Sequence, residues 1–172
     1  MSHYQNIIDY LEKHQVSFKT IHHEETRTSE ESARVRGVDL KTGGKALVLK
    51  IRDGDDNNDN NNDDNNTFAI FVLSASRKLH TKAIKKEFRS KNVRFATRDE
   101  LTLLTNGLLP GSVPPFGKPL INNSLNLYVD TSITEQDIIA FNCGSLTDSV
   151  IMSVSDYLKI SYPTKVFLFS KE

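Results

Sequence analysis

The order of its segments predicts that this chain folds as one α+β domain, residues 1–172, with a mixed, curled sheet of about seven strands surrounded by short helices. Three observations support this prediction. The chain has 172 residues, the size of one domain that can bury a core without disulfides. Segments with strand periodicity and helix periodicity follow one another irregularly. The sequence contains neither a glycine-rich phosphate loop nor a dinucleotide-binding fingerprint, so a doubly wound α/β fold is not indicated.

The N-terminal part of the chain predicts two helices and a strand. Apolar residues at helical spacing mark the inward face of an opening helix, at Tyr4, Ile7, Ile8 and Leu11. Val16 to Ile21 is then expected to form a short strand. Thr28-Ser29-Glu30-Glu31 matches a capping box, and Gly37 supplies a stop signal, so a short helix is expected between them.

An antiparallel hairpin is expected next, because the apolar runs Lys45–Ile51 and Phe68–Leu73 flank a polar insertion. The insertion, residues 54–66, consists of Asn and Asp after its first residue, Gly54, and it has no apolar residue to bury. We therefore expect a disordered loop. The insertion carries five aspartates, so the net charge of zero leaves +5 on the rest of the chain.

The second half of the chain predicts short helices that alternate with strands. One helix is expected from Thr81 to Arg89, and another begins at the capping box Thr97-Arg98-Asp99-Glu100 and ends at Asn106-Gly107. A third short helix is expected after Ser153. The remaining strands are expected at Val93–Ala96, Leu125–Val129, Ile138–Phe141, Ser149–Met152 and Lys165–Phe169.

Composition favours a cytoplasmic protein without a cofactor. The single cysteine, Cys143, cannot form an internal disulfide and fits a reducing compartment. No segment has the length and apolarity of a membrane span, so we expect no membrane partner. CxxC and HExxH patterns are absent. The tetrad His22-His23-Glu24-Glu25 offers four potential metal ligands, but neighbours on a strand point to opposite faces, so we expect no metal there without a special turn.

Two segments have the composition of ligand-binding loops. Gly107–Gly117 holds three of the eight glycines and three of the five prolines, which makes a stiff loop with backbone groups free to face a ligand. Asn142-Cys143-Gly144-Ser145 is a tight turn whose amides and polar side chains could bind an ester carbonyl or a ribose hydroxyl. Each segment also has a plain structural interpretation, as a rigid connector and as a hairpin turn.

Lys45 begins a strand on the same face as Leu47, Leu49 and Ile51. Its ammonium group either extends to solvent from the strand end or enters a pocket as a contact for an anion or a carbonyl group. The strand pattern alone leaves both interpretations open.

A strongly basic stretch runs from Arg77 to Arg98, with nine basic residues and the single acid Glu87. On and just before the predicted helix, spacing places five of them in one stripe: Lys78, Lys82, Lys85, Lys86 and Arg89. Together with Arg77 we call these residues the basic stripe. The stripe is either a solvated surface or a contact for a nucleic-acid backbone. In the second case it would set affinity and salt dependence rather than sequence choice.

The sequence has no arrangement typical of a protein nucleophile. Cys143 has no histidine nearby in sequence, no G-x-S-x-G motif exists, and all five histidines lie in the first 80 residues. Cys143 is most simply a small buried apolar residue.

Four motifs, in this order, resemble the YbaK/ProX family of aminoacyl-tRNA deacylases, which includes the editing domain inserted in bacterial prolyl-tRNA synthetases and its free-standing relatives. They are Lys45 after Gly43-Gly44, Pro110-Gly-Ser-Val-Pro-Pro-Phe-Gly117, Tyr128-Val-Asp130 and Phe141-Asn-Cys-Gly-Ser-Leu-Thr147. The resemblance extends from the Thr28 helix to the final strand, with the acidic run as an insertion.

The resemblance implies trans-editing, which is hydrolysis of the ester that joins a wrong amino acid to the terminal ribose of a tRNA. Similar proteins use an essential lysine and a glycine-rich loop, and water positioned by backbone groups and a ribose hydroxyl attacks in place of a protein nucleophile. The resemblance implies catalytic roles for Lys45, Gly111, Asn142, Gly144 and Ser145. It implies substrate contacts for Thr28, Ser112, Pro115, Phe116, Gly117 and Leu146. The basic stripe would bind the tRNA acceptor end, and the chain would act alone or dock on a synthetase.

One departure from the family concerns specificity. Some similar prolyl-tRNA editors carry a histidine just after the Gly-Ser of this turn, where the chain has Leu146, so the amino acid removed does not follow from the resemblance. Two other functions compete with deacylation. One is a module that binds tRNA ends or another ligand without turnover, and the other is a nucleic-acid chaperone that acts through the basic stripe alone. Deacylation ranks first because pure binding would not need Lys45, the glycine loop and the Asn142 turn together.

Overall fold

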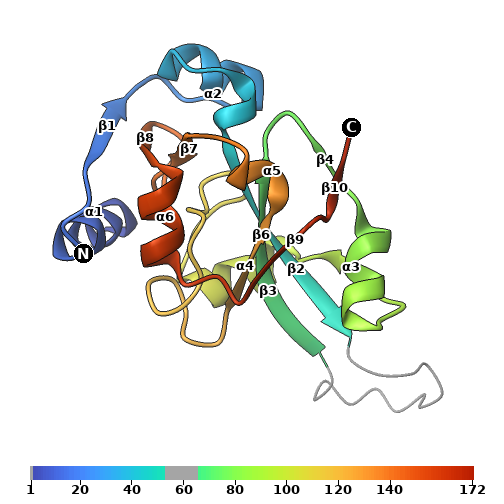
Figure 1. Cartoon of the computed structure of the whole chain (residues 1–172). Coiled ribbons are helices and arrows are strands. Elements are labelled where there is room, and N and C mark those ends of the chain that lie inside the picture. The colour runs from blue at the N-terminus through green and yellow to red at the C-terminus, as the bar shows by residue number, and fades with distance from the viewer. Residues whose placement is uncertain (1, 53–65) are drawn as a thin grey trace.

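The computed structural model describes residues 2–52 and 66–172, and its strands form three sheets (Figure 1). The largest sheet has five strands in the order β5 (Val93–Phe95), β2 (Gly44–Arg52), β3 (Asn66–Ser74), β6 (Asn126–Asp130) and β9 (Lys165–Phe167). A second sheet has the order β1 (Phe18–His22), β8 (Asp148–Ser153) and β7 (Ile138–Asn142). A third pairs β10 (Ser170–Lys171) with β4 (Lys78–Leu79).

Six α-helices and one 3-10 helix of the described residues surround these sheets. They are α1 (His3–Lys13), α2 (Ser29–Arg36), η1 (Leu40–Thr42), α3 (Thr81–Phe88), α4 (Arg98–Thr105), α5 (Thr131–Thr134) and α6 (Val154–Ser161). None of the helices in the described part of the chain has the length and apolarity to cross a membrane.

The α+β class and the mixed sheet are confirmed, but the prediction of one sheet with about seven strands is wrong. The largest sheet has five strands, because β1, β7 and β8 pair with one another instead of extending it. The pairing of β3 with β6 and of β6 with β9 is parallel, and the other pairs are antiparallel. Strand periodicity located most of the strands, but it carries no information about which strands pair.

The five-stranded sheet is buried on both faces. In β3, Ile70 and Val72 point into one core, which also takes in α1, α6, β7 and β8. The alternate residues Phe71 and Leu73 point into a second core, closed by Ile84 of α3 and by Phe169 near the C-terminus. Burial on both faces explains why this strand is an unbroken apolar run instead of an alternating one. Figure 1 shows the three-stranded sheet and α6 on one side of this sheet and α3 on the other.

The two larger sheets touch where β2 begins. Gly43 forms an isolated bridge with Ala140 of β7. A Cβ atom on Gly44 would lie 2.6 Å from Ile139 Cδ1, and one on Gly43 would lie 2.9 Å from Ala75 Cβ. Such distances are shorter than van der Waals contact, so a side chain on Gly44 would separate the sheets, and one on Gly43 would clash with the residue that follows β3. The two glycines therefore bring Lys45 next to the end of β7.

The helix signals of the sequence are confirmed. Thr28 and Thr97 are N-caps whose side chains accept from Glu31 N and Glu100 N, and Gly37 ends α2 in the left-handed conformation. Sequence analysis did not find β4, α5, η1 and β10, all of which have four residues or fewer. The predicted insertion, 54–66, lies outside the described residues except for Asn66, which belongs to β3.

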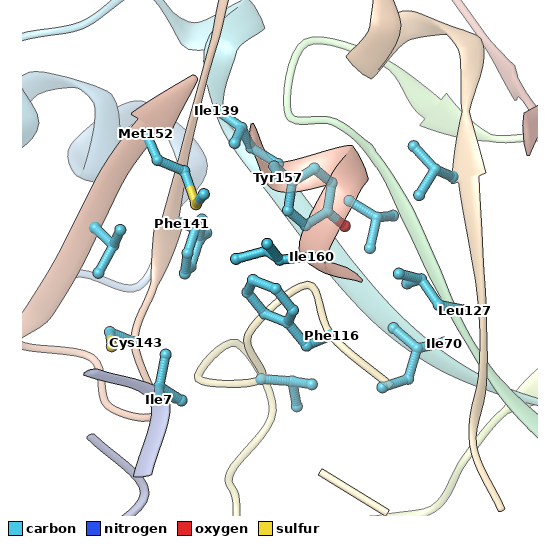
Figure 2. Packing of buried hydrophobic residues seen from close by; sticks show 14 of the residues in the cluster. Ile7, Ile70, Phe116, Leu127, Ile139, Phe141, Cys143, Met152, Tyr157 and Ile160 are labelled. Carbon is cyan, nitrogen blue, oxygen red and sulfur yellow. The ribbon is translucent and has the colours of Figure 1, made fainter. Parts of the chain in front are cut away.

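The loop after α4 enters the core. Phe116 is 1% exposed and meets Phe141 and Tyr157 edge-on, at centroid distances of 5.7 and 5.4 Å (Figure 2). The Tyr157 hydroxyl donates to the Pro115 carbonyl at 2.6 Å. Prolines and an aromatic anchor thus fix this half of the loop, while Pro110 and Gly111 remain exposed.

We predict that Gly117→Ala lowers the free energy of unfolding by about 2 kcal/mol or more, because the added Cβ would lie 2.3 Å from the Leu125 carbonyl oxygen. Urea denaturation followed by circular dichroism measures the change. Gly37→Asn is the control: nothing lies within 4 Å of its Cβ position, and Asn accepts the left-handed conformation found there. Equal stability losses in the two variants would contradict this account.

Candidate functional site

A cavity of about 340 Å³ opens between the N-terminus of α2, the start of β2, the Pro/Gly loop and the end of β7. It is large enough for a small ligand. Five of the residues proposed from the sequence line it: Thr28, Lys45, Gly111, Asn142 and Leu146. Three cations and no acidic side chain are among its lining residues; the cations are Arg27, Arg36 and Lys45.

Lys45 is the second residue of β2, and it lines the cavity. Its Nζ lies 3.4 Å from the carbonyl oxygen of Arg77, the residue at which the basic stripe begins. Desolvation lowers the pKa of the Lys45 ammonium group, and the nearby Glu30 carboxylate opposes this shift. The strand pattern left open whether the Lys45 side chain extends to solvent or enters a pocket. In the structure it lines a pocket.

Arg36 is a charged lining residue that sequence analysis missed, as it missed Thr26 and Ser32. It is the last residue of α2, and its guanidinium group makes three contacts: Nε donates to Ser149 Oγ at 2.8 Å, Nη2 to Asn142 Oδ1 at 2.9 Å, and Nη1 to the Ala140 carbonyl at 3.5 Å. Burial lowers the pKa of this guanidinium to about 10. Its partners are more than 100 residues away in sequence, so no local signal could have revealed it.

Asn142 joins the two loops that the sequence singled out. Its Nδ2 donates to the Gly111 carbonyl at 2.6 Å, while its Oδ1 accepts from Arg36. A second bond between the loops runs from Gly144 N to the Ser112 carbonyl, at 3.1 Å. Gly111 and Gly144 both have positive φ, which allows these backbone directions. The Pro/Gly loop is therefore attached to the Asn142 turn at the cavity wall.

The structure places several proposed residues behind the cavity instead of in its lining. Four of them are buried: Ser112, Pro115, Phe116 and Gly117. Phe116, for which a substrate contact was expected, packs in the core and does not line the cavity. Gly144 lies against α1, where a Cβ would come within 2.8 Å of His3 Cβ. These residues support the cavity. Their roles in ligand contact stay predictions.

Comparison with known proteins identifies the family. Residues 23–160 match the family described as the aminoacyl-tRNA editing domain. The chain belongs to this family. It is 29% identical over 164 residues to the multifunctional Ser/Thr-tRNA deacylase ProXp-y of Escherichia coli (strain K12). The aligned region covers 95% of this chain and 90% of that protein.

Solved structures agree on the fold. A structure described as a trans-editing enzyme for prolyl-tRNA synthetase matches with a TM-score of 0.78 and 19% identity, covering 100% of this chain and 98% of that chain. A signal transduction protein from Marinobacter aquaeolei matches with a TM-score of 0.64 and 15% identity, covering 98% of this chain but only 31% of that one. At such low identity these two matches establish the fold alone.

Membership of the editing-domain family confirms the resemblance seen in the sequence. It also confirms the predicted class of activity, that of a hydrolase which deacylates mischarged aminoacyl-tRNA. The cavity of this editing domain lies at the motifs that carried the resemblance, since Lys45, Gly111 and Asn142 all line it.

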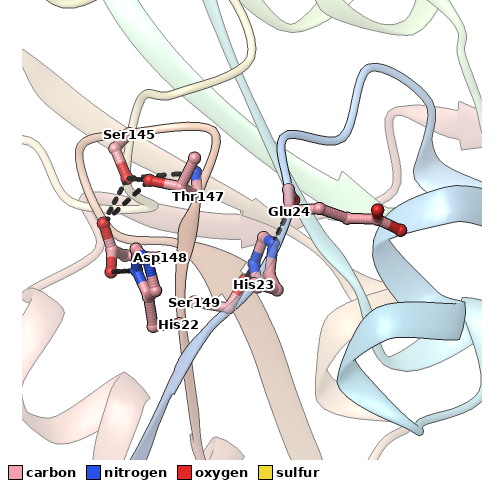
Figure 3. A network of polar contacts seen from close by, with 7 residues as sticks. All are labelled: His22, His23, Glu24, Ser145, Thr147, Asp148 and Ser149. Carbon is pink, nitrogen blue, oxygen red and sulfur yellow. Dashed lines mark hydrogen bonds and ion pairs between the residues drawn. The ribbon is translucent and has the colours of Figure 1, made fainter.

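Beside the cavity, a polar cluster fixes the turn after β7 of the editing domain (Figure 3). Ser145 Oγ donates to Asp148 Oδ2 at 2.8 Å and accepts from Thr147 N at 3.2 Å, and His22 Nδ1 lies 2.8 Å from Asp148 Oδ1. Desolvation raises the pKa of the Asp148 carboxyl group, but hydrogen bonds from His22, Ser145 and Thr147 outweigh it and lower the pKa. Ser145 therefore holds the turn and does not line the cavity.

The histidines of the 22–25 tetrad have separate partners. His22 contacts Asp148, whereas His23 contacts the Glu24 carbonyl and Ser149 Oγ, at 2.7 and 2.8 Å. Within residues 2–52 and 66–172, no group of three or more His, Cys, Asp and Glu side chains is placed to hold a metal ion.

The basic stripe of the editing domain lies on the outer side of α3. Lys82, Lys86 and Arg89 are exposed, and Ile84 points into the core, as the spacing predicts. Among the described residues, Lys82, Lys85, Lys86 and Arg89 form no ion pair. Arg77 is held by Ser170, to which its Nε donates at 2.7 Å. The backbone carbonyl of Arg77, the residue at which the stripe begins, lies next to Lys45 Nζ.

Proposed function

We propose that this editing domain hydrolyses, in trans, the ester of tRNA mischarged with a small hydroxyl-bearing amino acid, and that the reaction takes place in the cavity of Lys45 and Arg36. The observation that carries this proposal is the convergence of two cations and two anchored loops on one open cavity. The serine and threonine preference named for the relative from Escherichia coli supports the substrate class.

In this proposal Lys45 binds the phosphate of the last nucleotide. Its ammonium group lies 3.4 Å from the backbone carbonyl of Arg77, so the start of the basic stripe is beside the cavity. A tRNA acceptor end that follows the stripe would bring its terminal phosphate to Lys45 and its aminoacyl ester further in. Gly111 and the backbone beside it would position the attacking water. Asn142 would support this role, because its side chain donates a hydrogen bond to the Gly111 carbonyl.

Water is the proposed nucleophile because Cys143 is unsuited to the role. This cysteine is fully buried, and desolvation with the nearby Asp148 carboxylate raises the pKa of its thiol to about 12. The reactive thiolate is therefore scarce at neutral pH.

The amino acid is proposed to contact a pair of hydroxyl groups. Thr26 Oγ1 and Ser32 Oγ lie 2.8 Å apart. The two residues are only 2% and 7% exposed, and both line the cavity. Among the described residues the two hydroxyls bond only to each other. Only one of the two hydroxyl protons can be used in this bond, so the other has no acceptor. The oxygen of a substrate hydroxyl can accept it. We also propose that the domain acts unattached or docked on a synthetase, as the structural match to a trans-editing enzyme suggests.

We predict that the protein releases labelled amino acid from seryl- or threonyl-tRNA in a panel charged with alanine, cysteine, serine, threonine and proline, and that Lys45→Ala lowers this rate by about 100-fold. Lys41→Ala, an exposed lysine four residues earlier, is the control and should stay within about twofold of wild type. Salt-sensitive binding of tRNA without release of any amino acid would favour the binding module instead.

Reversing charge on the stripe should affect tRNA but not a minimal ester. We predict that the triple variant Lys82→Glu, Lys85→Glu, Lys86→Glu weakens tRNA affinity and flattens its dependence on salt, by a slope of about one for each lost phosphate contact. Hydrolysis of seryl-adenosine should be unchanged. The control triple Lys13→Glu, Lys19→Glu, Lys159→Glu changes net charge equally at exposed sites elsewhere. The same loss in both triples would mean that no specific stripe exists.

The hydroxyl pair gives a prediction about specificity. Thr26→Val keeps the side-chain shape but removes a hydroxyl, so we expect kcat/KM for the seryl ester to fall by about 10-fold while that for the alanyl ester stays the same. The ratio of the two esters, measured in one preparation, cancels any general effect on folding. An unchanged ratio would remove this pair from recognition.

A further inference from the structure

Arg36 brings a half-buried positive charge to a cavity whose lining contains no acidic residue. Within the described chain it forms no ion pair, whereas Arg27 at the rim of the same cavity pairs with Glu25 at 3.1 Å. Burial without a carboxylate partner lowers the pKa of the Arg36 guanidinium to about 10, which leaves it charged at neutral pH. Burying an uncompensated charge is costly, so the arrangement favours a ligand oxygen that is negative or becomes negative.

The guanidinium group is held in one orientation. Its Nε donates to Ser149 Oγ, and Ser149 is fully buried. His23 lies on the other side of this hydroxyl: its Nδ1 donates to the Glu24 carbonyl, so its Nε2 is the acceptor for the Ser149 proton (Figure 3). In this series of hydrogen bonds, Arg36 Nε donates to Ser149, Ser149 donates to His23, and His23 donates to the Glu24 carbonyl. Such a network keeps the charge in place before a substrate arrives.

Two N–H groups of Arg36 remain for a ligand. A guanidinium carries five of them, and the contacts with Ser149, Asn142 and Ala140 use three. Their acceptors all belong to β7 and β8, at the wall of the cavity. The remaining two have no acceptor among the described residues, and Arg36 lines the cavity, so a bound molecule can reach them.

The two cations of the cavity have different surroundings. Lys45 lies next to Arg77 and so on the side of the basic stripe, whereas Arg36 lies next to Asn142, which holds Gly111. We infer that Arg36 contacts the carbonyl oxygen of the scissile ester and stabilises the negative charge that develops on it during hydrolysis. This inference rests on the proposed function, and it assigns a catalytic role to a residue that the family motifs do not include.

The step balances as an ordinary ester hydrolysis. The water oxygen forms a bond to the carbonyl carbon, and the electron pair of the C=O bond moves to the oxygen held by Arg36. When this pair returns, the bond from carbon to the ribose oxygen breaks, and the ribose oxygen takes a proton that originates from the water. The products are the free amino acid and a tRNA with its terminal hydroxyl restored.

The first test separates kcat from KM. Arg36→Gln should lower kcat for the seryl ester by about 100- to 1000-fold and change KM by less than about threefold, because the contact strengthens only as charge develops. Arg36→Lys should lose less, since it keeps the charge but not the fork. Arg34→Gln is the matched control, on the same helix but exposed and paired with Glu24, and it should behave as wild type.

The second test does not depend on turnover. Calorimetry compares two analogues of 3′-seryl-adenosine: a phosphonate, whose charged tetrahedral phosphorus replaces the ester carbon, and a planar amide. Wild type should prefer the phosphonate, and Arg36→Gln should lose at least about 10-fold of that preference. Thermal melting of each variant monitors folding, and Arg36→Lys takes the place of Arg36→Gln if the latter does not fold.

Three outcomes are distinguishable. A kcat loss together with a lost preference for the phosphonate supports the role of Arg36. Active wild type with an unchanged kcat in folded Arg36→Gln, or with a rise in KM alone, overturns this role and leaves the proposed function intact. Wild type that hydrolyses no ester of the panel overturns both.

Discussion

The close approach of Gly43 and Gly44 to β7 is the contact on which the site depends. It joins the two larger sheets through the bridge from Gly43 to Ala140 and at Gly44, where a side chain would push the sheets apart. Because of it, the start of β2, which carries Lys45, reaches the strand end that carries Asn142. The cavity between them belongs to neither sheet alone. Its shape thus depends on packing in both cores, and three of its lining side chains, those of Arg36, Lys45 and Asn142, are positioned by regular elements.

Electrostatics and packing serve the same end in this cavity. The lining contains cations, hydroxyls, an amide, three glycines and apolar side chains, with no acid to neutralise the cations. Thr28 and Ser29 add the N-terminus of α2, whose free amides carry partial positive charge. The two packed cores, which include the aromatic contacts around Phe116 and Phe71, stabilise the fold that keeps these charges together. In the proposed function, the terminal phosphate and the ester oxygen of the substrate would offset the cost of that charge on binding.

The parts of this molecule that local sequence predicts are those with local causes. Capping at Thr28 and Thr97, the two strands of the β2–β3 hairpin and the face of α3 all follow from spacing, and the structure has each of them. Strand pairing does not follow, which is why a single seven-strand sheet was expected. Lys45 was found because it stands beside a glycine pair. Arg36 was not, because its contacts lie 104 to 113 residues away along the chain.

The pairing of β2 with β3 places the point at which the Asn/Asp-rich run is inserted at the opposite end of the hairpin from Lys45. Lys45 pairs with Leu73 at one end of the hairpin, and Arg52 pairs with Asn66 at the other, where the run is inserted. Seven residue steps separate Lys45 from Arg52, which at the rise of a strand is about 23 Å. The contact of the two sheets and the cations at the cavity are thus formed by residues at the opposite end of the hairpin from the point of insertion. The residues proposed for ester hydrolysis and the point of insertion therefore belong to different ends of the same pair of strands.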